Sequence, residues 1–396
     1  MSDQDPIVIV GAARTPMGGF QGVLSGANAP DLGATAIQGA LNDANVAPEL
    51  IEEIIMGCVL PAGQGQAPAR QAALGAGLPL GSGATTVNKM CGSGMKAAML
   101  AHDLLVAQSA EIIVAGGMES MTNAPYLLPK MRGGARLGHG QVIDHMFLDG
   151  LEDAYDKGRL MGTFAEDCAQ TYQFTREAQD AYAISSLERA QAAITEGRFK
   201  AEITPVTVKT RRGEIIVDTD EQPGNARPEK IPQLKPAFRK DGTVTAANSS
   251  SISDGAAALV LMRASKAEAL GLTPRARIVG HATYADKPSL FSTAPIGAMR
   301  KLSAKTGWDL ADVDLFEVNE AFAVVAMAAM RDLDLPHDKV NVNGGACALG
   351  HPIGASGARV MVTLLAAMED RGVNRGVASL CIGGGEATAI AIERIA

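Results

Sequence analysis

The feature that most restricts the fold of this chain is an approximate internal duplication. An apolar, strand-like run that ends in glycine occurs at residues 7–11 and again at 277–280. Three further pairs follow in the same order: 53–57 with 314–318, 87–91 with 342–347, and the helix-to-strand stretches 94–117 with 357–383. The partners lie 255 to 269 residues apart. Single matches this short arise by chance, but their shared order indicates two equivalent α/β halves with largely buried strands.

The stretch between the repeated patterns, residues 122–247, has a different character. It contains a glycine-rich segment at 133–140, which we expect to be a mobile loop, and an apolar periodicity over 175–196 that predicts an amphipathic helix. Basic residues and prolines dominate 203–240. The pattern of the first half then resumes in a strand predicted at 256–262. We interpret the intervening stretch as an inserted region that covers a small-molecule site.

Composition and charge narrow the class of protein. Aromatic residues make up 4% of the chain and glycines number 44, which favours close helix-on-sheet packing of small apolar side chains. A net charge of −8 argues against a general nucleic-acid binder. Residues 198–240 nevertheless hold ten Lys/Arg against six Asp/Glu, so the remainder carries −12. This basic strip either holds a phosphorylated ligand or is a solvated loop face, and charge leaves both interpretations open.

Cysteine usage and hydropathy bear on the compartment. The five cysteines are odd in number and form no C-x-x-C, which is typical of free thiols in a reducing environment. Cys347 and His351 lie four residues apart, but without a second ligand pair we predict no metal site. The first residues lack a signal-peptide pattern, and the longest apolar run, 321–330, is too short to span a bilayer. We expect a cytoplasmic protein without membrane contact.

Cys91 is the first of four candidate reactive residues. Small residues follow it at 92–94, as at a strand-to-helix turn that leaves room for a substrate and for backbone N–H groups facing an oxyanion. A helix N-terminus and a nearby imidazole can lower a thiol pKa from about 8.5. Taken alone, a free cysteine is more often a buried small hydrophobe.

The other three candidates lie in the second half of the chain. His351 stands within 344–357, a glycine-rich run suited to holding a functional group on an irregular loop. Cys381 ends an apolar strand and precedes three glycines, so it is either a core residue or a proton shuttle. Asn319 follows a strand and opens an apolar helix predicted at 320–331, where its ordinary role would be a helix cap. A functional role for it would be to hold a water or a carbonyl.

Taken together, these four segments resemble the motifs of the thiolase family, and the resemblance covers essentially the whole chain. Residues 11–16 and 255–258 also match. The resemblance implies an α/β thiolase-like fold of two similar halves, each with a mixed sheet between helices, and a loop domain inserted in the first. The implied boundaries are 1–121 and 248–272 for the N-terminal domain, 122–247 for the inserted domain and 273–396 for the C-terminal domain.

The resemblance also implies a ping-pong acyl transfer. Cys91, activated by His351, would take the acyl group, and Cys381 would act as acid and base at the α-carbon. His351 and a water held by Asn319 would stabilise the thioester enolate. The N–H groups of Cys91 and Gly383 would stabilise the tetrahedral oxyanion. The two steps place charge on different oxygens, so two oxyanion sites make physical sense.

Ligands and assembly are implied in the same way. Coenzyme A and acyl-CoA are the expected substrates, with no permanently bound cofactor, and the assembly is expected to be a homotetramer. The expected contacts with coenzyme A are Leu151, Phe238, Ala246 and Ser250, and the basic strip would meet its phosphates. The expected acyl pocket consists of Met161, Phe291, Ala321 and Phe322, and the bulk of Met161 and Phe291 indicates a short acyl group.

Departures from the family pattern affect ligand details more than the reaction. Glu386 and Ala387 end the last motif where a glycine usually closes it, and Leu160 replaces a histidine common in short-chain members. Arg227 is a candidate replacement for an arginine often found just before it. Three alternatives stay open: a degradative 3-ketoacyl-CoA thiolase, a decarboxylating condensing enzyme, which Cys381 argues against, and a non-catalytic acyl-CoA or lipid carrier.

Overall fold

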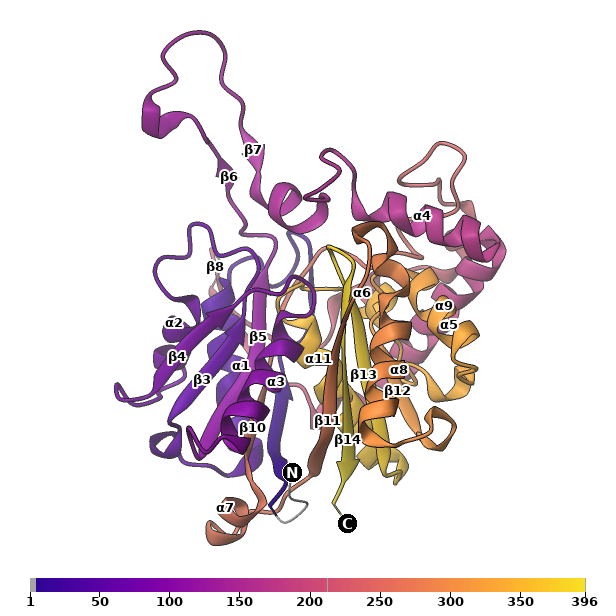
Figure 1. The fold of residues 1–396 in the computed structure, drawn as a ribbon. Coiled ribbons are helices and arrows are strands. Elements are labelled where there is room, and N and C mark those ends of the chain that lie inside the picture. Colours follow the sequence, from indigo (N-terminus) through magenta and orange to yellow (C-terminus); the bar gives the residue numbers. More distant parts are fainter. Residues whose placement is uncertain (1–4, 212, 396) are drawn as a thin grey trace.

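The computed structural model describes residues 5–211 and 213–395, and its centre is one ten-stranded sheet (Figure 1). The strands of this sheet are β1 (Ile7–Arg14), β2 (Gly18–Gly19), β3 (Glu53–Gly57), β4 (Gly83–Val87), β5 (Ile112–Ser120), β10 (Ser253–Arg263), β11 (Ala276–Ala285), β12 (Leu315–Val318), β13 (Arg375–Ile382) and β14 (Glu386–Arg394). Their order is β12-β13-β14-β11-β1-β10-β5-β3-β4, and β2 pairs with β10.

The sheet consists of two similar halves joined at β1 and β11. In the first half β3 runs parallel to β4 and β5, and β10 runs antiparallel to β5. In the second half β12 runs parallel to β13, and β14 runs antiparallel to β13. Two residue pairs, Val8 with Arg277 and Ile9 with Ala276, connect the halves. The predicted α/β class, with a mixed sheet in each half, is confirmed.

Helices α3 (Ser93–Val106) and α11 (Ser356–Arg371) form the central layer between the two halves of the sheet. Their first turns touch at two glycines. A Cβ on Gly357 would lie 2.3 Å from the backbone nitrogen of Met95, and one on Gly94 would lie 2.7 Å from that of Ala358. Only glycine permits this approach, and it brings two helix N-termini to one point.

Outer helices cover the remaining faces of the sheet. The first half is covered by α1 (Ala29–Ala44) and α2 (Pro68–Gly75), and the second by α8 (Ala294–Thr306) and α9 (Ala323–Asp332). Alanine, valine, isoleucine, leucine and methionine dominate the buried clusters, as the low aromatic content predicts. Within the described residues, no helix combines the length and apolar character that crossing a bilayer requires.

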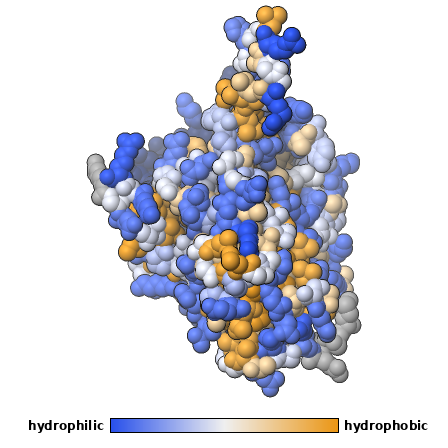
Figure 2. All heavy atoms as spheres, turned by 90° about the vertical axis from the view of Figure 1, so that its left-hand side faces the viewer, coloured by the Kyte–Doolittle hydropathy of each residue, from blue (hydrophilic) through white to orange (hydrophobic). Residues whose placement is uncertain are grey.

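The chain leaves the sheet after β5 and returns at β10. Two short strands, β6 (Tyr126–Leu127) and β7 (Ile143–Asp144), form the base of an arm that projects from the body (Figure 1), and Figure 2 shows hydrophobic and hydrophilic residues intermixed on it. The remaining elements of this stretch are α4 (Met161–Tyr172), α5 (Arg176–Thr195), β8 (Val206–Thr210), β9 (Gly213–Val217) and α6 (Glu221–Asn225). The exact domain boundaries stay predictions.

One expected helix begins later than the sequence suggests. Helix α9 starts at Ala323 with Phe322 as its N-cap, so the expectation that Asn319 caps a helix is wrong. The backbone between them bonds to residues 248–250 instead: Ser250 N–H donates to the Ala321 carbonyl, and Ala323 N–H donates to that of Asn248. The expected helix over 175–196 is observed as α5, capped by the Thr175 hydroxyl.

Candidate active site

A cavity of about 360 Å³ lies beside the segments that lead into α3 and α11. Three of the five candidate catalytic residues line it: Cys91, His351 and Gly383. All four candidate coenzyme contacts and all four candidate pocket residues line it as well: Leu151, Phe238, Ala246, Ser250, Met161, Phe291, Ala321 and Phe322. Asn319 and Cys381 are buried behind this surface.

Cys91 lies in a tight turn between β4 and α3. Met90 adopts the left-handed conformation (φ 47°), and its N–H donates to the side-chain oxygen of Asn88 at 2.9 Å. The Ser93 hydroxyl accepts from Lys89 N–H at 2.8 Å and donates to the Met90 carbonyl at 2.6 Å. Local side-chain bonds therefore hold a strained turn that presents the sulfur to the cavity.

The electrostatics of Cys91 differ from expectation. Burial raises the pKa of the thiol to about 11, although the backbone N–H groups of Gly383 and Cys91 partly oppose this shift. The expected lowering of the pKa by the helix N-terminus and an imidazole is therefore wrong for the resting protein. The thiol is protonated near pH 7, so its attack on a carbonyl requires a proton acceptor.

His351 provides such an acceptor. Its Nδ1 lies 2.6 Å from the Ser356 hydroxyl, whereas Nε2, in a ring that lines the cavity, is buried with no hydrogen-bond partner among the described residues. Burial, aided by the Arg359 charge, lowers the pKa of His351 to about 3, so the ring is neutral at pH 7. The Ser356 hydroxyl lies 2.9 Å from the Pro352 carbonyl, so it can accept from a protonated Nδ1 or donate to a bare one.

Asn319 lies directly after β12, beside the histidine. Its Nδ2 is 3.5 Å from Nδ1 of His351, and its Oδ1 is 3.4 Å from Nη2 of Arg359. Arg359 in turn lies 3.4 Å from Oε2 of Glu317, a carboxyl whose pKa burial raises to about 8. Both contacts of Asn319 are long, so its amide keeps the capacity to bind a further group.

Cys381 is completely buried near the end of β13. Burial raises the pKa of its thiol, and the charge of a Cys91 thiolate adds to that effect. The two sulfurs therefore interact electrostatically. Gly384 and Gly385, both in left-handed conformations, reverse the chain between β13 and β14.

Three functional candidates escaped the sequence analysis. Ser356 is the first residue of α11 and Arg359 lies about one turn later, so their place at the start of the helix that follows His351 offers the only sequence signal. Glu119 is the third: its buried carboxylate accepts from the N–H groups of Val59, Leu60 and Gly354 at 2.9 to 3.1 Å. It thus ties the His351 loop to the first half. Burial raises the pKa of Glu119 to about 7.

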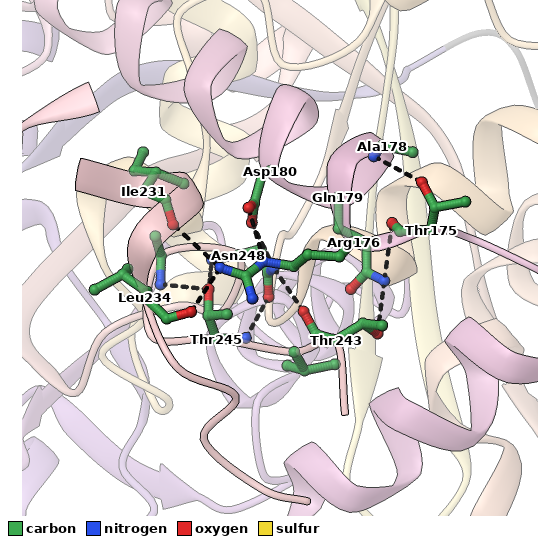
Figure 3. Close-up of polar contacts among 12 residues, drawn as sticks. Thr175, Arg176, Ala178, Gln179, Asp180, Ile231, Leu234, Thr243, Thr245 and Asn248 are labelled. Carbon is green, nitrogen blue, oxygen red and sulfur yellow. Dashed lines mark hydrogen bonds and ion pairs between the residues drawn. The ribbon is translucent and has the colours of Figure 1, made fainter. Parts of the chain in front are cut away.

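Hydrogen bonds attach residues 231–248, which cover the cavity, to helix α5 (Figure 3). Arg176 donates to the carbonyls of Ile231 and Leu234. Asn248 donates to Asp180 at 3.0 Å, and Gln179 donates to the Thr243 hydroxyl. These bonds fix the ends of the segment that contributes Phe238 and Ala246 to the cavity.

A second cavity, of about 410 Å³, adjoins the first and shares Ala246 and Ser251 with it. Arg227 and Lys230 line this second cavity. Two other cations of the basic strip, Arg198 and Arg239, pair with Glu196 and Asp167. Cys347, matched to Cys91 by the repeat, also lines the second cavity and not the first.

Family models describe both halves of the chain. The model "Thiolase, N-terminal domain" matches residues 7–265, and "Thiolase, C-terminal domain" matches residues 272–394.

The chain belongs to the thiolase family.

Relatives agree with this assignment. The acetyl-CoA acetyltransferase of Pseudomonas aeruginosa is 51% identical over 98% of this chain and 99% of its own length. Acetyl-CoA acetyltransferase 2 of Arabidopsis thaliana is 51% identical over 98% of this chain and 96% of its own. The crystal structure of the Bacillus anthracis acetyl-CoA acetyltransferase superposes with a TM-score of 0.96 at 42% identity, covering 99% of both chains. The expected resemblance and the thiolase fold are confirmed.

A further solved structure contains a ligand. It is a thiolase from Ascaris suum in complex with coenzyme A, with a TM-score of 0.93 and 41% identity, covering 98% of this chain and all of that one.

Proposed function

We propose that this enzyme catalyses the reversible Claisen condensation of two acetyl-CoA molecules to acetoacetyl-CoA and CoA, by a ping-pong mechanism through an acyl thioester on Cys91. One observation carries the proposal: the Cys91 thiol and a His351 ring with an unpartnered Nε2 share one apolar cavity. The names of the relatives support an acetyl group as the unit transferred.

In the first step the sulfur of Cys91 attacks the thioester carbonyl, and its proton passes to Nε2 of His351. Because their pKa values leave both groups neutral at pH 7, proton transfer and carbon–sulfur bond formation proceed together. The oxyanion accepts from the N–H groups of Cys91 and Gly383, each typically contributing roughly 10²–10³ in rate. The bond from the carbonyl carbon to the CoA sulfur then breaks, and His351 returns the proton to that sulfur.

In the second step Cys381 releases its proton to water, which returns one at the end of the cycle, and the thiolate removes an α-proton from a second acetyl-CoA. The enolate oxygen is stabilised by His351, in the tautomer protonated at Nε2, and by a water held by Asn319. Ser356 supports that tautomer by donating to Nδ1, and water entering after CoA departs allows the ring to exchange its proton. The enolate carbon attacks the acetyl carbonyl, the bond to Cys91 breaks, and the proton on Cys381 passes to the Cys91 sulfur.

The two cavities suit the two ends of the substrate. The apolar cavity would take the acyl group and the pantetheine arm, with Leu151, Phe238, Ala246 and Ser250 as contacts. Arg227 and Lys230 in the adjoining cavity would meet the phosphates. A short acyl group is supported by an aromatic wall, in which the rings of Phe291 and Phe322 lie 6.3 Å apart and Met161 lies beside them.

We propose a homotetramer in the cytoplasm without a permanently bound cofactor. The five cysteines, all free in the structure, suit a reducing compartment. Light scattering on the purified protein gives the number of subunits.

The decisive experiment is peptide mass spectrometry after incubation with acetoacetyl-CoA. We expect one acetyl group on Cys91, none in Cys91→Ala, and an unchanged yield in the matched control Cys168→Ala, which removes a buried thiol outside the site. Binding of acyl-CoA without any acetylation would identify a carrier. Thiolysis rates over a series of acyl lengths should fall beyond short chains, whereas a flat profile would identify a degradative 3-ketoacyl-CoA thiolase.

A further inference from the structure

An ion pair joins the two halves of the molecule at the edge of the active site. The Lys89 ammonium, two residues before Cys91, donates to the Glu386 carboxylate, three residues after Gly383. Both side chains are partly shielded, at 22% and 36% exposure. In the part of the chain that the structure describes, neither has another ion-pair partner. The contact thus links the loop that holds the nucleophile to the loop that holds an oxyanion donor.

The backbone at both residues of this ion pair is held by hydrogen bonds and strand pairing. Lys89 N–H donates to the Ser93 hydroxyl, and the Lys89 carbonyl accepts from Gly92 N–H at 3.1 Å. Glu386 opens β14, where it is paired with Ile382 of β13 on one side and with Ala285 of β11 on the other. Since neither backbone is free to follow its side chain, the ion pair fixes the spacing of the two loops.

Apolar contacts between the same loops lie beside the ion pair. A Cβ on Gly92 would lie 2.4 Å from Cδ1 of Ile382, so the two loops are in direct contact there. A Cβ on Gly383 would lie 3.9 Å from Cε of Met90. The N–H of Gly383, from the second half, faces the Cys91 sulfur, from the first. The length of that one contact therefore depends on how closely the loops are held together.

We propose that Lys89 and Glu386 are positioning residues that hold the Gly383 N–H at the oxyanion formed during acyl transfer to and from Cys91. This inference rests on the proposed function. It assigns a role to the unusual Glu386, which no reaction step uses. Because the ion pair acts through Gly383, it serves the step in which the oxyanion lies beside Cys91. It does not serve proton abstraction by Cys381, where His351 and Asn319 act.

The test separates the two steps. In Glu386→Gln and in Lys89→Met, we expect the single-turnover rate of Cys91 acetylation by saturating acetoacetyl-CoA to fall roughly tenfold, because the oxyanion donor is displaced but not lost. KM and the deuterium exchange of the α-protons of acetyl-CoA should stay within about twofold. The charge-swapped double variant K89E/E386K should recover most of the rate. At 1 M salt, which screens exposed charges, the parent rate should approach that of Glu386→Gln.

A matched control lies far from the site. Lys266 forms a comparable surface ion pair with Glu111, so Lys266→Met should leave acetylation unchanged. Parent-like acetylation in Glu386→Gln would overturn the positioning role, as would equal losses in acetylation and in α-proton exchange, which would indicate general loosening. If the proposed function were wrong, the parent protein itself would form no acetyl-enzyme. That result differs from either outcome that would overturn the positioning role.

Discussion

The two halves of this thiolase have the same arrangement of strands and helices, but they contribute different catalytic residues. Strands β3 and β12 begin 262 residues apart, and helices α3 and α11 begin 263 apart. At these offsets the position of Asn319 corresponds to Gly57, and that of Cys381 corresponds to Met118. The first half thus contributes the nucleophile but has no polar side chain at the positions that correspond to Asn319 and Cys381.

The difference is largest in the loop before each central helix. Five residues separate β4 from α3, and the nucleophile Cys91 is one of them. In the second half, fifteen residues separate Val340, which forms a bridge with Phe316, from α11. The longer loop contains α10 (Ala346–Leu349) and His351. A duplicated fold can therefore build an asymmetric site by lengthening one loop and changing a few strand-end residues.

The largest expected effect comes from removing the acid–base residue of the second half. Replacing Cys381→Ala should leave acetylation of Cys91 within about threefold. Condensation should fall roughly 10³-fold, because general base catalysis typically contributes about 10²–10⁴. Deuterium exchange of the α-protons of acetyl-CoA, followed by NMR, measures the loss. Exchange at the parent rate would mean that the base lies elsewhere.

A second test concerns the nucleophile of the first half. Below a pKa of about 11 the thiolate fraction rises tenfold per pH unit, so alkylation of Cys91 by iodoacetamide should accelerate about a hundredfold between pH 7 and pH 9. Peptide mapping follows the modification. A free cysteine peptide, as control, should level off near its ordinary pKa of about 8.5. A plateau for Cys91 near pH 7 would show that the resting thiol is already activated.

The glycine contact between α3 and α11 tests how closely the halves must approach. Gly357→Ala should lower the free energy of unfolding by about 1–3 kcal/mol, and Gly94→Ala by less, because the clash of the former with backbone is tighter. Denaturant unfolding measures both. Gly81→Ala, where nothing lies within 4 Å of the added methyl, is the control. Equal stability in all three variants would argue that the helices can move apart freely.

The smallest effect is expected at Ser356. Ser356→Ala removes the 2.6 Å partner of Nδ1 and leaves the His351 ring without its closest hydrogen bond. We expect both half-reactions to slow about tenfold, with KM nearly unchanged, because ring orientation and tautomer matter in each. Stopped-flow acylation and α-proton exchange report the two separately. A loss confined to one half-reaction would show that Ser356 serves a single tautomer.

Local sequence was enough to predict the two α/β halves and the order of their strands and helices. Apolar strands and helical periodicities repeat in order, and motif residues such as Cys91 and His351 mark the point where the halves meet. Properties that arise from distant contacts could not be predicted. Burial reverses the expected shift of the Cys91 pKa, and residues 248–250 take the backbone bonds that would have let Asn319 cap a helix. Glu119 likewise has partners far away in the chain.

The division of the active site between two halves, joined at β1 and β11, has a consequence for biosynthesis. The nascent chain presents Cys91 to the cell 260 residues before His351 leaves the ribosome. Because domains generally form in the order of their synthesis, the first half has a framework for its thiol long before any proton acceptor arrives. Acyl transfer assisted by His351 is thus postponed until the second half has been added.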